Sequence, residues 1–87
     1  NPNLKAQGFL VTPNPTTGIM NVQFYPTPEK LLAIQVYTLS GQRIRNIIPS
    51  NGVSSLYTLD LSSQPSGVYI VRALFSDKVM VRKIIKQ

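Results

Sequence analysis

Gly67-Val68-Tyr69-Ile70-Val71-Arg72-Ala73 is the stretch that decides the fold of this 87-residue chain. It is the longest run of strand-forming residues, and the turn sequence Gln64-Pro65-Ser66-Gly67 introduces it. Valine, isoleucine and tyrosine favour the pleated surface of a sheet, while proline followed by glycine is typical of a turn. We therefore predict a strand that begins at Gly67, with Tyr69, Val71, Ala73 and Phe75 facing the core and Val68, Ile70, Arg72 and Leu74 facing outward.

Six further segments have the composition or the alternation of strands. In the clearest one, Met20, Val22 and Phe24 alternate with Asn21 and Gln23, which is the period-2 pattern of a half-buried strand. Turns rich in proline, glycine and serine separate the segments. The predicted strands are 8–12, 19–25, 31–37, 43–48, 56–61, 67–75 and 79–86. We expect inward side chains at Leu32, Ile34, Val36, Tyr57, Leu59 and Leu61, and Arg43 and Arg45 on a shared solvent face.

Short strands at regular spacing, without helical periodicity, predict an all-β fold. The architecture we expect is an immunoglobulin- or fibronectin-like antiparallel β-sandwich of about seven short strands. Tyr69 stands just after a proline-containing corner, where such sandwiches often place a tyrosine whose hydroxyl bonds back to the corner. Plain burial of Tyr69 in the core is the alternative. We expect residues 1–8 to be a linker from the upstream part of a longer protein and residues 9–87 to be the folded domain.

The last predicted strand does not alternate cleanly. Either choice of inner face places a cation there, Arg82 or Lys83. A bulge would reconcile this pattern, and so would an edge position, where an inward charge blocks unwanted pairing.

Composition excludes most catalytic and metal-binding schemes. The chain has neither histidine nor cysteine, so the usual general base and the commonest metal ligands are missing. Its three carboxylates, Glu29, Asp60 and Asp77, are too widely spaced to predict a shared site, and we expect them on the solvated surface. We therefore predict no enzyme activity and no cofactor. No apolar run is as long as the ~20 residues that a membrane-spanning helix needs.

The net charge of +6 suggests an anionic partner. Nucleic acid is one candidate, because six cations could line a basic face with a tyrosine available for stacking. However, the tyrosines lie in apolar strand contexts and no nucleic-acid motif is present, so we predict no nucleic-acid binding. The six cations are Arg43, Arg45, Arg72, Arg82, Lys83 and Lys86.

Four motifs in order resemble one protein family. The stretch Val11-Thr12-Pro13-Asn14-Pro15-Thr16-Thr17-Gly18 is similar to its Pro-Asn-Pro-x-x-Gly opening, and Val36-Tyr37-Thr38-Leu39-Ser40-Gly41-Gln42-Arg43 to its central hairpin. Leu61 through Arg72 is similar to its Leu-x-x-x-x-x-Gly-x-Tyr motif, and the ending Arg82-Lys83-Ile84-Ile85-Lys86-Gln87 to its basic and apolar end. The chain thus resembles the type A C-terminal sorting domain of the type IX secretion system. Thr38 departs from the family's usual Asp or Asn at a turn position.

This resemblance implies a secretion signal that directs a larger passenger protein across the outer membrane. Its implied partners are the outer-membrane translocon, its shuttle proteins and a sortase-like peptidase that acts near the N-terminal linker, often with attachment of the passenger to an anionic lipopolysaccharide. The implied location is the periplasm in transit, then the cell surface or the extracellular medium. The alternative from another class is a fibronectin-like adhesive or carbohydrate-binding module. A carbohydrate-binding module usually exposes aromatic side chains on one face, whereas this chain has no tryptophan and we expect its tyrosines to be structural.

We expect such a signal to be recognised by its exterior. An exposed β edge can pair with a partner strand, and alternate side chains can give specificity. The predicted docking residues are Val81, Arg82, Lys83, Ile84, Ile85, Lys86, Val68 and Ile70. The motif residues to which we assign mainly a structural role are Pro13, Asn14, Pro15, Gly18, Gly41, Gly67 and Tyr69. An exposed edge also predicts a tendency toward strand-swapped dimers.

Overall fold

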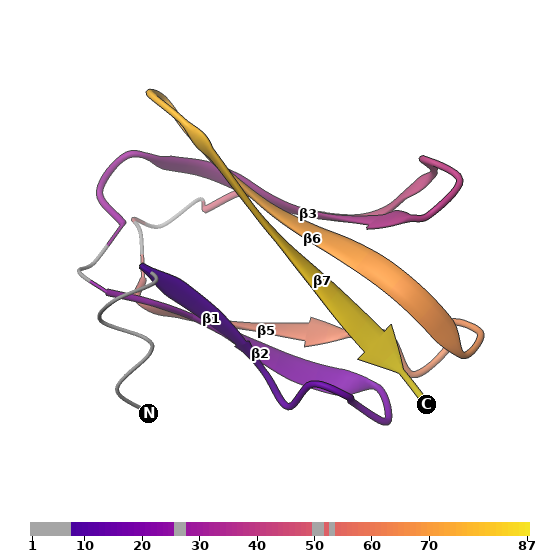
Figure 1. Cartoon of the computed structure of the whole chain (residues 1–87). Coiled ribbons are helices and arrows are strands. Elements are labelled where there is room, and N and C mark those ends of the chain that lie inside the picture. The colour runs from indigo at the N-terminus through magenta and orange to yellow at the C-terminus, as the bar shows by residue number, and fades with distance from the viewer. Residues whose placement is uncertain (1–7, 26–27, 50–51, 53) are drawn as a thin grey trace.

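The computed structural model describes residues 8–25, 28–49, 52 and 54–87, and it arranges them as two packed sheets. The strands are β1 (Phe9–Thr12), β2 (Ile19–Phe24), β3 (Leu31–Thr38), β4 (Arg43–Ile47), β5 (Leu56–Asp60), β6 (Gly67–Phe75) and β7 (Val79–Lys86). One sheet has the order β1-β2-β5 and the other the order β4-β3-β6-β7, and all neighbouring strands are antiparallel. Figure 1 shows the two layers face to face. The predicted all-β sandwich is confirmed. The predicted linker is residues 1–8, of which residues 1–7 lie outside the described part of the chain.

The core lies between the two sheets and is built from the inward positions of each strand. On β6, Tyr69, Val71 and Ala73 are buried and alternate with half-buried outward residues, as predicted. On β2, the alternation also places the expected face inward. Three aromatic rings fill one end of the core, where Phe24 stacks on Phe9 and meets Phe75 edge to face. The remaining buried apolar residues are Val11, Met20, Val22, Leu31, Ala33, Ile34, Val36, Leu59, Leu61 and Ile84.

The start of β6 is fixed by a tyrosine corner. The Tyr69 hydroxyl donates a hydrogen bond of 2.6 Å to the carbonyl oxygen of Pro65. Tyr69 is also 4% exposed, so its ring is part of the core while its hydroxyl ties down the preceding turn. The predicted corner is therefore confirmed.

The inward assignment of Leu32 is wrong. The register of β3 against β6 shifts between Leu31 and Ala33, because Leu31 lies opposite Phe75 and Ala33 lies opposite Leu74. One extra residue in a strand makes a bulge and reverses the facing of what precedes it. Leu31 is consequently buried, while Leu32 is the extra residue and is 56% exposed.

The prediction that Arg43 and Arg45 share a face is also wrong. The register of β4 against β3 shifts, so that Arg43 lies opposite Tyr37 and Arg45 opposite Val36. Because Tyr37 and Val36 are neighbours on a strand, their partners lie on opposite faces. Arg45 is therefore on the inner side, where its Nε and Nη2 donate to the carbonyl oxygen of Asp60 at 3.2 and 3.0 Å.

Among the residues that the structure describes, no helix is long and apolar enough to cross a membrane.

Candidate recognition surface

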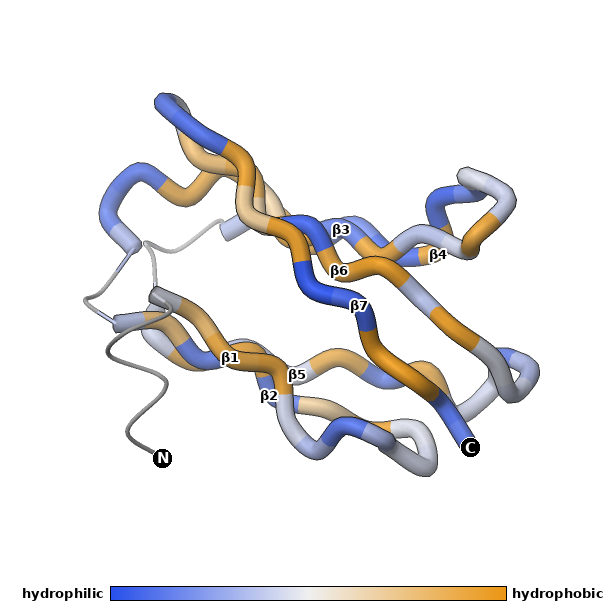
Figure 2. Tube along the Cα trace, viewed as in Figure 1, coloured by the Kyte–Doolittle hydropathy of each residue, from blue (hydrophilic) through white to orange (hydrophobic). Residues whose placement is uncertain are grey.

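β7 is an edge strand with an inward cation. It pairs with β6 in unbroken register from Val79 to Lys86, so its irregular pattern reflects its edge position and not a bulge. Arg82 faces inward at the side of the sandwich, with its guanidinium carbon 4.5 Å from the centroid of the Phe9 ring. A cation over an aromatic face is attracted to it, so the Arg82 charge is stabilised at the core boundary. Figure 2 shows β7 as hydrophobic on both sides of a short hydrophilic stretch, which is Arg82 and Lys83.

The outer edge of β7 is bonded by the loop between β1 and β2. The Asn14 side chain donates from Nδ2 to the carbonyl oxygen of Lys83 at 3.2 Å, and its Oδ1 accepts the Ile85 amide at 3.0 Å. An asparagine side chain carries both a donor and an acceptor, so it can take the place of a neighbouring strand. In Figure 1 the end of β7 lies beside this loop.

Thr16 extends the same contact along the backbone. Its amide donates to the carbonyl oxygen of Ile85 at 2.9 Å, and its carbonyl oxygen accepts the Gln87 amide at 2.8 Å. Thr16 and Lys86 form a parallel bridge, and Thr16 is 1% exposed. We call residues 14–16 the clasp, because they bond the outer edge of β7 over its last residues.

The clasp corrects the expectation of an open terminal edge. Between Lys83 and Gln87, four backbone groups of β7 and of Gln87 point away from β6, and all four are bonded to the clasp. They are the carbonyl groups of Lys83 and Ile85 and the amides of Ile85 and Gln87. The carbonyl oxygen of Val81 accepts a further bond from Arg82 Nη1 at 2.9 Å. A partner strand therefore cannot pair along this part of β7 without displacing the clasp.

The motif glycines lie in turns or at strand ends, and Gly18 contacts the clasp. The Gly18 amide donates to the Thr16 hydroxyl at 3.1 Å, and a Cβ on Gly18 would lie 3.0 Å from the Cα of Ser62. Gly41 has a φ of 97°, which favours glycine, in the turn between β3 and β4. Gly67 has the same φ as Gly18, 156°, but open space around its Cβ position. Of these three motif glycines, Gly18 is the one at which a side chain would closely meet neighbouring atoms.

The predicted docking residues divide between the two faces of β7. Ile84 is fully buried in the core, Lys86 is 9% exposed and Arg82 faces inward. The outward residues are Val81, Lys83 and Ile85, and the pairing with β6 places them beside Val68, Ile70 and Arg72. Of the predicted set, only Val68, Ile70, Val81, Lys83 and Ile85 are brought together on one outer face.

The outer face of the four-stranded sheet combines apolar side chains with cations. We define the recognition face as the outward residues of β6 and β7, namely Val68, Ile70, Arg72, Leu74, Val79, Val81, Lys83 and Ile85. Arg43 lies on the same side of the sheet, because it pairs with Tyr37, which pairs with Ile70. The docking prediction omitted Arg72, Leu74 and Val79, although the period-2 spacing from Val79 to Ile85 already groups the outward residues of β7.

Arg72 is held in place on this face. Its guanidinium carbon lies 5.4 Å from the centroid of the Tyr37 ring. The Tyr37 hydroxyl donates to Gln35 Oε1 at 2.9 Å, and Gln35 Nε2 lies 3.4 Å from Asn46 Oδ1. These contacts connect the outward side chains of β3, β4 and β6 and hold the Arg72 guanidinium over the Tyr37 ring.

The six cations considered for nucleic-acid binding do not share a face. Arg43, Arg72 and Lys83 lie on the outer side of the four-stranded sheet. Arg45 and Arg82 contact inner positions, and Lys86 is buried. The nucleic-acid-binding alternative assumed one basic face formed by all six cations, and the fold does not form such a face.

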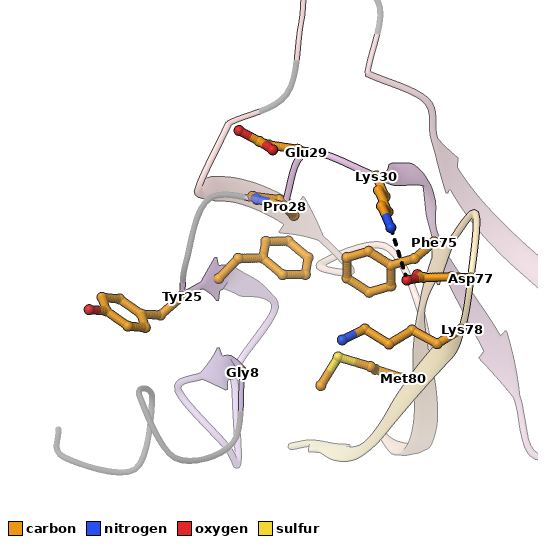
Figure 3. Close-up of a pocket in the computed structure, with 10 residues that line it drawn as sticks. Gly8, Tyr25, Pro28, Glu29, Lys30, Phe75, Asp77, Lys78 and Met80 are labelled. Carbon is orange, nitrogen blue, oxygen red and sulfur yellow. Dashed lines mark hydrogen bonds and ion pairs between the residues drawn. The ribbon is translucent and has the colours of Figure 1, made fainter.

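A cavity of about 240 Å³ lies at the end of the sandwich beside Gly8. Figure 3 shows Phe75 and Met80 at this cavity and Tyr25 pointing away from it. Lys30 and Asp77 form an exposed ion pair of 3.4 Å at its rim. The described residues contain no group of three side chains that could hold a metal ion. The cavity therefore combines an apolar wall, which includes Phe75 and Met80, with a rim that includes the Lys30–Asp77 ion pair.

The third carboxylate, Asp60, is engaged locally. The Ser62 hydroxyl and the Ser62 amide both donate to Asp60 Oδ1, at 2.6 and 2.9 Å. These bonds, the hydroxyl bond first, lower the pKa of Asp60, and the nearby Arg45 charge lowers it further. Asp60 is thus an ionised residue at the end of β5.

Comparison with known proteins identifies the family. No curated protein matches the chain. A family model described as "Secretion system C-terminal sorting domain" matches residues 10–87, and this match gives no support to an adhesive or carbohydrate-binding module. The match covers nearly the whole sandwich, including the clasp and the recognition face. The chain therefore belongs to the secretion system C-terminal sorting domains, the family of type IX sorting signals that its four motifs indicated.

Proposed function

We propose that this domain carries a larger passenger protein through the periplasm and across the outer membrane, and that the translocon and its shuttle proteins bind its folded exterior. Membership in the family supports a sorting role. The observation that carries the proposal is the exposed recognition face on β6 and β7, which joins apolar side chains such as Ile85 to the cation Lys83. Exposed apolar patches on small domains commonly mark interaction sites.

In this proposal the domain is a sorting signal and does not itself catalyse a reaction. A sortase-like peptidase removes it by cutting near the linker, residues 1–8, and the passenger is then attached to the cell surface through an anionic lipopolysaccharide. One feature supports this order of events. Gly8 precedes β1, whereas the clasp lies in the loop that follows β1. A cut within residues 1–8 therefore removes no residue of the clasp or of the recognition face.

A transplant tests the proposal. The domain is fused to the C-terminus of a foreign exported protein in a host with a working type IX system, and the surface fraction is measured by protease accessibility in intact cells. A sorting domain that is known to function in the host is the positive control, and the foreign protein alone is the negative control. We expect the fusion to reach the surface. A fusion that stays inside while the positive control is displayed contradicts the proposal.

A further inference from the structure

The clasp and the recognition face together determine how a partner can approach. On the edge of β7, the outward backbone groups near its end are already bonded to Asn14 and Thr16. Strand addition needs unpaired amides and carbonyls in a row. The terminal part of this edge does not offer such a row, so a partner that approaches this end of β7 contacts the side chains of the face and not the backbone of the edge.

The apolar part of the face is formed by side chains of both β6 and β7. Pairing with β6 places Ile85 beside Val68 and Val81 beside Arg72. Val79, Val81 and Ile85 are 49%, 47% and 46% exposed, although each belongs to a strand that otherwise buries its apolar side chains. The outward side chains of Val68, Ile70 and Leu74 on β6 join them, and the resulting apolar strip passes between Lys83 and Arg72.

The cations flank this strip at fixed positions. One row across the sheet runs Lys83, Ile70, Tyr37 and Arg43, so that a cation stands at each end of an apolar centre. Arg72 lies in the next row and is held over Tyr37. The described strands contribute no carboxylate to this face, because Asp60 is on β5 and Glu29 and Asp77 are in turns.

The opposite outer surface has the reverse character. The outward residues of β1, β2 and β5 include no cation and one acid, Asp60. They also include exposed apolar side chains, Ile19 and Leu56, but these are separated by polar residues such as Asn21 and Thr58, which bond to each other at 3.1 Å. Among the described strands, positive charge and exposed apolar area therefore coincide on the outer side of the four-stranded sheet.

We propose that the recognition face docks flat against a protein surface that has an apolar strip flanked by carboxylates. This inference rests on the proposed function and names the chemistry of the partner. Paired charges across an interface fix its register and exclude wrong partners. A protein can place carboxylates to match Lys83, Arg72 and Arg43. A lipid surface fits less well, because interfacial binding relies on protruding aromatic and apolar anchors, and Tyr37, the aromatic residue of this face, has its hydroxyl bonded to Gln35.

Two matched pairs of substitutions in the passenger fusion test the inference. Ile85→Gln removes an apolar side chain from the face, and Leu56→Gln removes one of similar exposure, 49% against 46%, from the opposite side. Lys83→Glu reverses a charge on the face, and Lys78→Glu makes the same change in the β6–β7 turn. Circular dichroism and thermal melting of each purified domain establish that it is folded.

We expect Ile85→Gln and Lys83→Glu to lower the surface fraction about tenfold, which corresponds to the loss of one good interface contact. We expect Leu56→Gln and Lys78→Glu to leave the surface fraction within about twofold of the unsubstituted fusion. Lys83→Arg keeps the positive charge, so we expect it to be displayed normally. Normal display of both face variants overturns the inference while the proposed function stands. Failure of the unsubstituted fusion refutes the proposed function instead.

A binding measurement separates protein from lipid. The purified domain is mixed with vesicles that contain phosphatidylglycerol and sedimented at physiological salt. We expect less than about one tenth of the domain to sediment, since the described strands place three cations, Arg43, Arg72 and Lys83, on this side of the sheet. Strong sedimentation that Lys83→Glu abolishes would assign the face to a lipid surface and overturn the choice of a protein partner.

Discussion

The Ile85 amide donates a hydrogen bond of 3.0 Å to the side-chain oxygen of Asn14, which lies 71 residues earlier in the chain. The amide nitrogen of the same asparagine side chain lies 3.2 Å from the carbonyl oxygen of Lys83. One loop residue therefore holds both a donor and an acceptor of the final strand. This contact gives the Asn of the Pro-Asn-Pro motif a physical role, which is to protect the strand that carries the recognition face.

Removal of the Asn14 side chain should loosen the end of β7. Asn14→Ala loses two hydrogen bonds to the backbone, so we expect the free energy of unfolding to fall by about 1–3 kcal/mol. Hydrogen exchange at the Ile85 amide should become faster, while exchange at amides in the centre of β6 follows global stability. Asn14→Asp is the matched control, because it keeps the acceptor for Ile85 and loses the donor for Lys83. Unchanged exchange at Ile85 in Asn14→Ala would refute the clasp.

The tyrosine corner should stabilise the turn before β6. Tyr69→Phe keeps the buried ring and removes the hydroxyl that bonds to Pro65. We expect a loss of about 1 kcal/mol in the free energy of unfolding by urea, with an unchanged dependence on urea concentration. Equal stability of the two proteins would show that the ring alone accounts for the role of Tyr69.

Gly18 should be less replaceable than Gly67. Both have a φ of 156°, but a Cβ at Gly18 would lie 3.0 Å from Ser62, whereas at Gly67 nothing lies within 4 Å. Alanine at each position therefore imposes the same backbone cost, and Gly18→Ala adds crowding of about 1–3 kcal/mol. Thermal melting of the two variants measures the difference. A Gly67→Ala protein that melts at or below the temperature of Gly18→Ala would contradict this account.

The Asp60 carboxyl should titrate below its usual range. Its pKa is lowered first by the Ser62 hydroxyl bond and then by the Ser62 amide bond. A folded-state pKa below the unfolded value stabilises the domain above the unfolded pKa, and this contribution disappears as the pH falls through the folded pKa. NMR titration of the Asp60 carboxyl carbon in Ser62→Ala should show the pKa rising toward its ordinary value. An identical titration in the two proteins would contradict the assignment.

The strands were predictable because alternation is a local property. A period of two along Met20, Val22 and Phe24 already indicates which face is buried, and the corner at Tyr69 follows from the turn before it. The two bulges were not predictable in this way. The extra residues, Leu32 and Ile44, are defined by the partner strand, since the register shifts appear only when β3 is aligned with β4 and β6.

The recognition face was predicted in part. Its outward residues follow from alternation along β6 and β7, but the list also contained Ile84, which the register places in the core, and Lys86, which is nearly buried. The clasp was not predicted, because the contact between Asn14 and β7 depends on where two distant segments meet in the folded domain. Local sequence gives a loop rigidified by prolines and does not say what the loop touches.

The central claim is that export depends on the folded exterior of the sandwich and not on a linear sequence of residues near its end. Val22→Asp tests this claim most directly, because Val22 is fully buried, lies on β2 and belongs to neither the recognition face nor β7. Its register partners, Val11 and Tyr57, carry no charge. An unpaired carboxylate in the core unfolds a small domain while leaving residues 79–87 unchanged in sequence. The measurement is the surface fraction of intact passenger in the Val22→Asp fusion, relative to the unsubstituted fusion in the same host. We predict that the Val22→Asp fusion remains inside the cell, and display at the unsubstituted level would contradict the account.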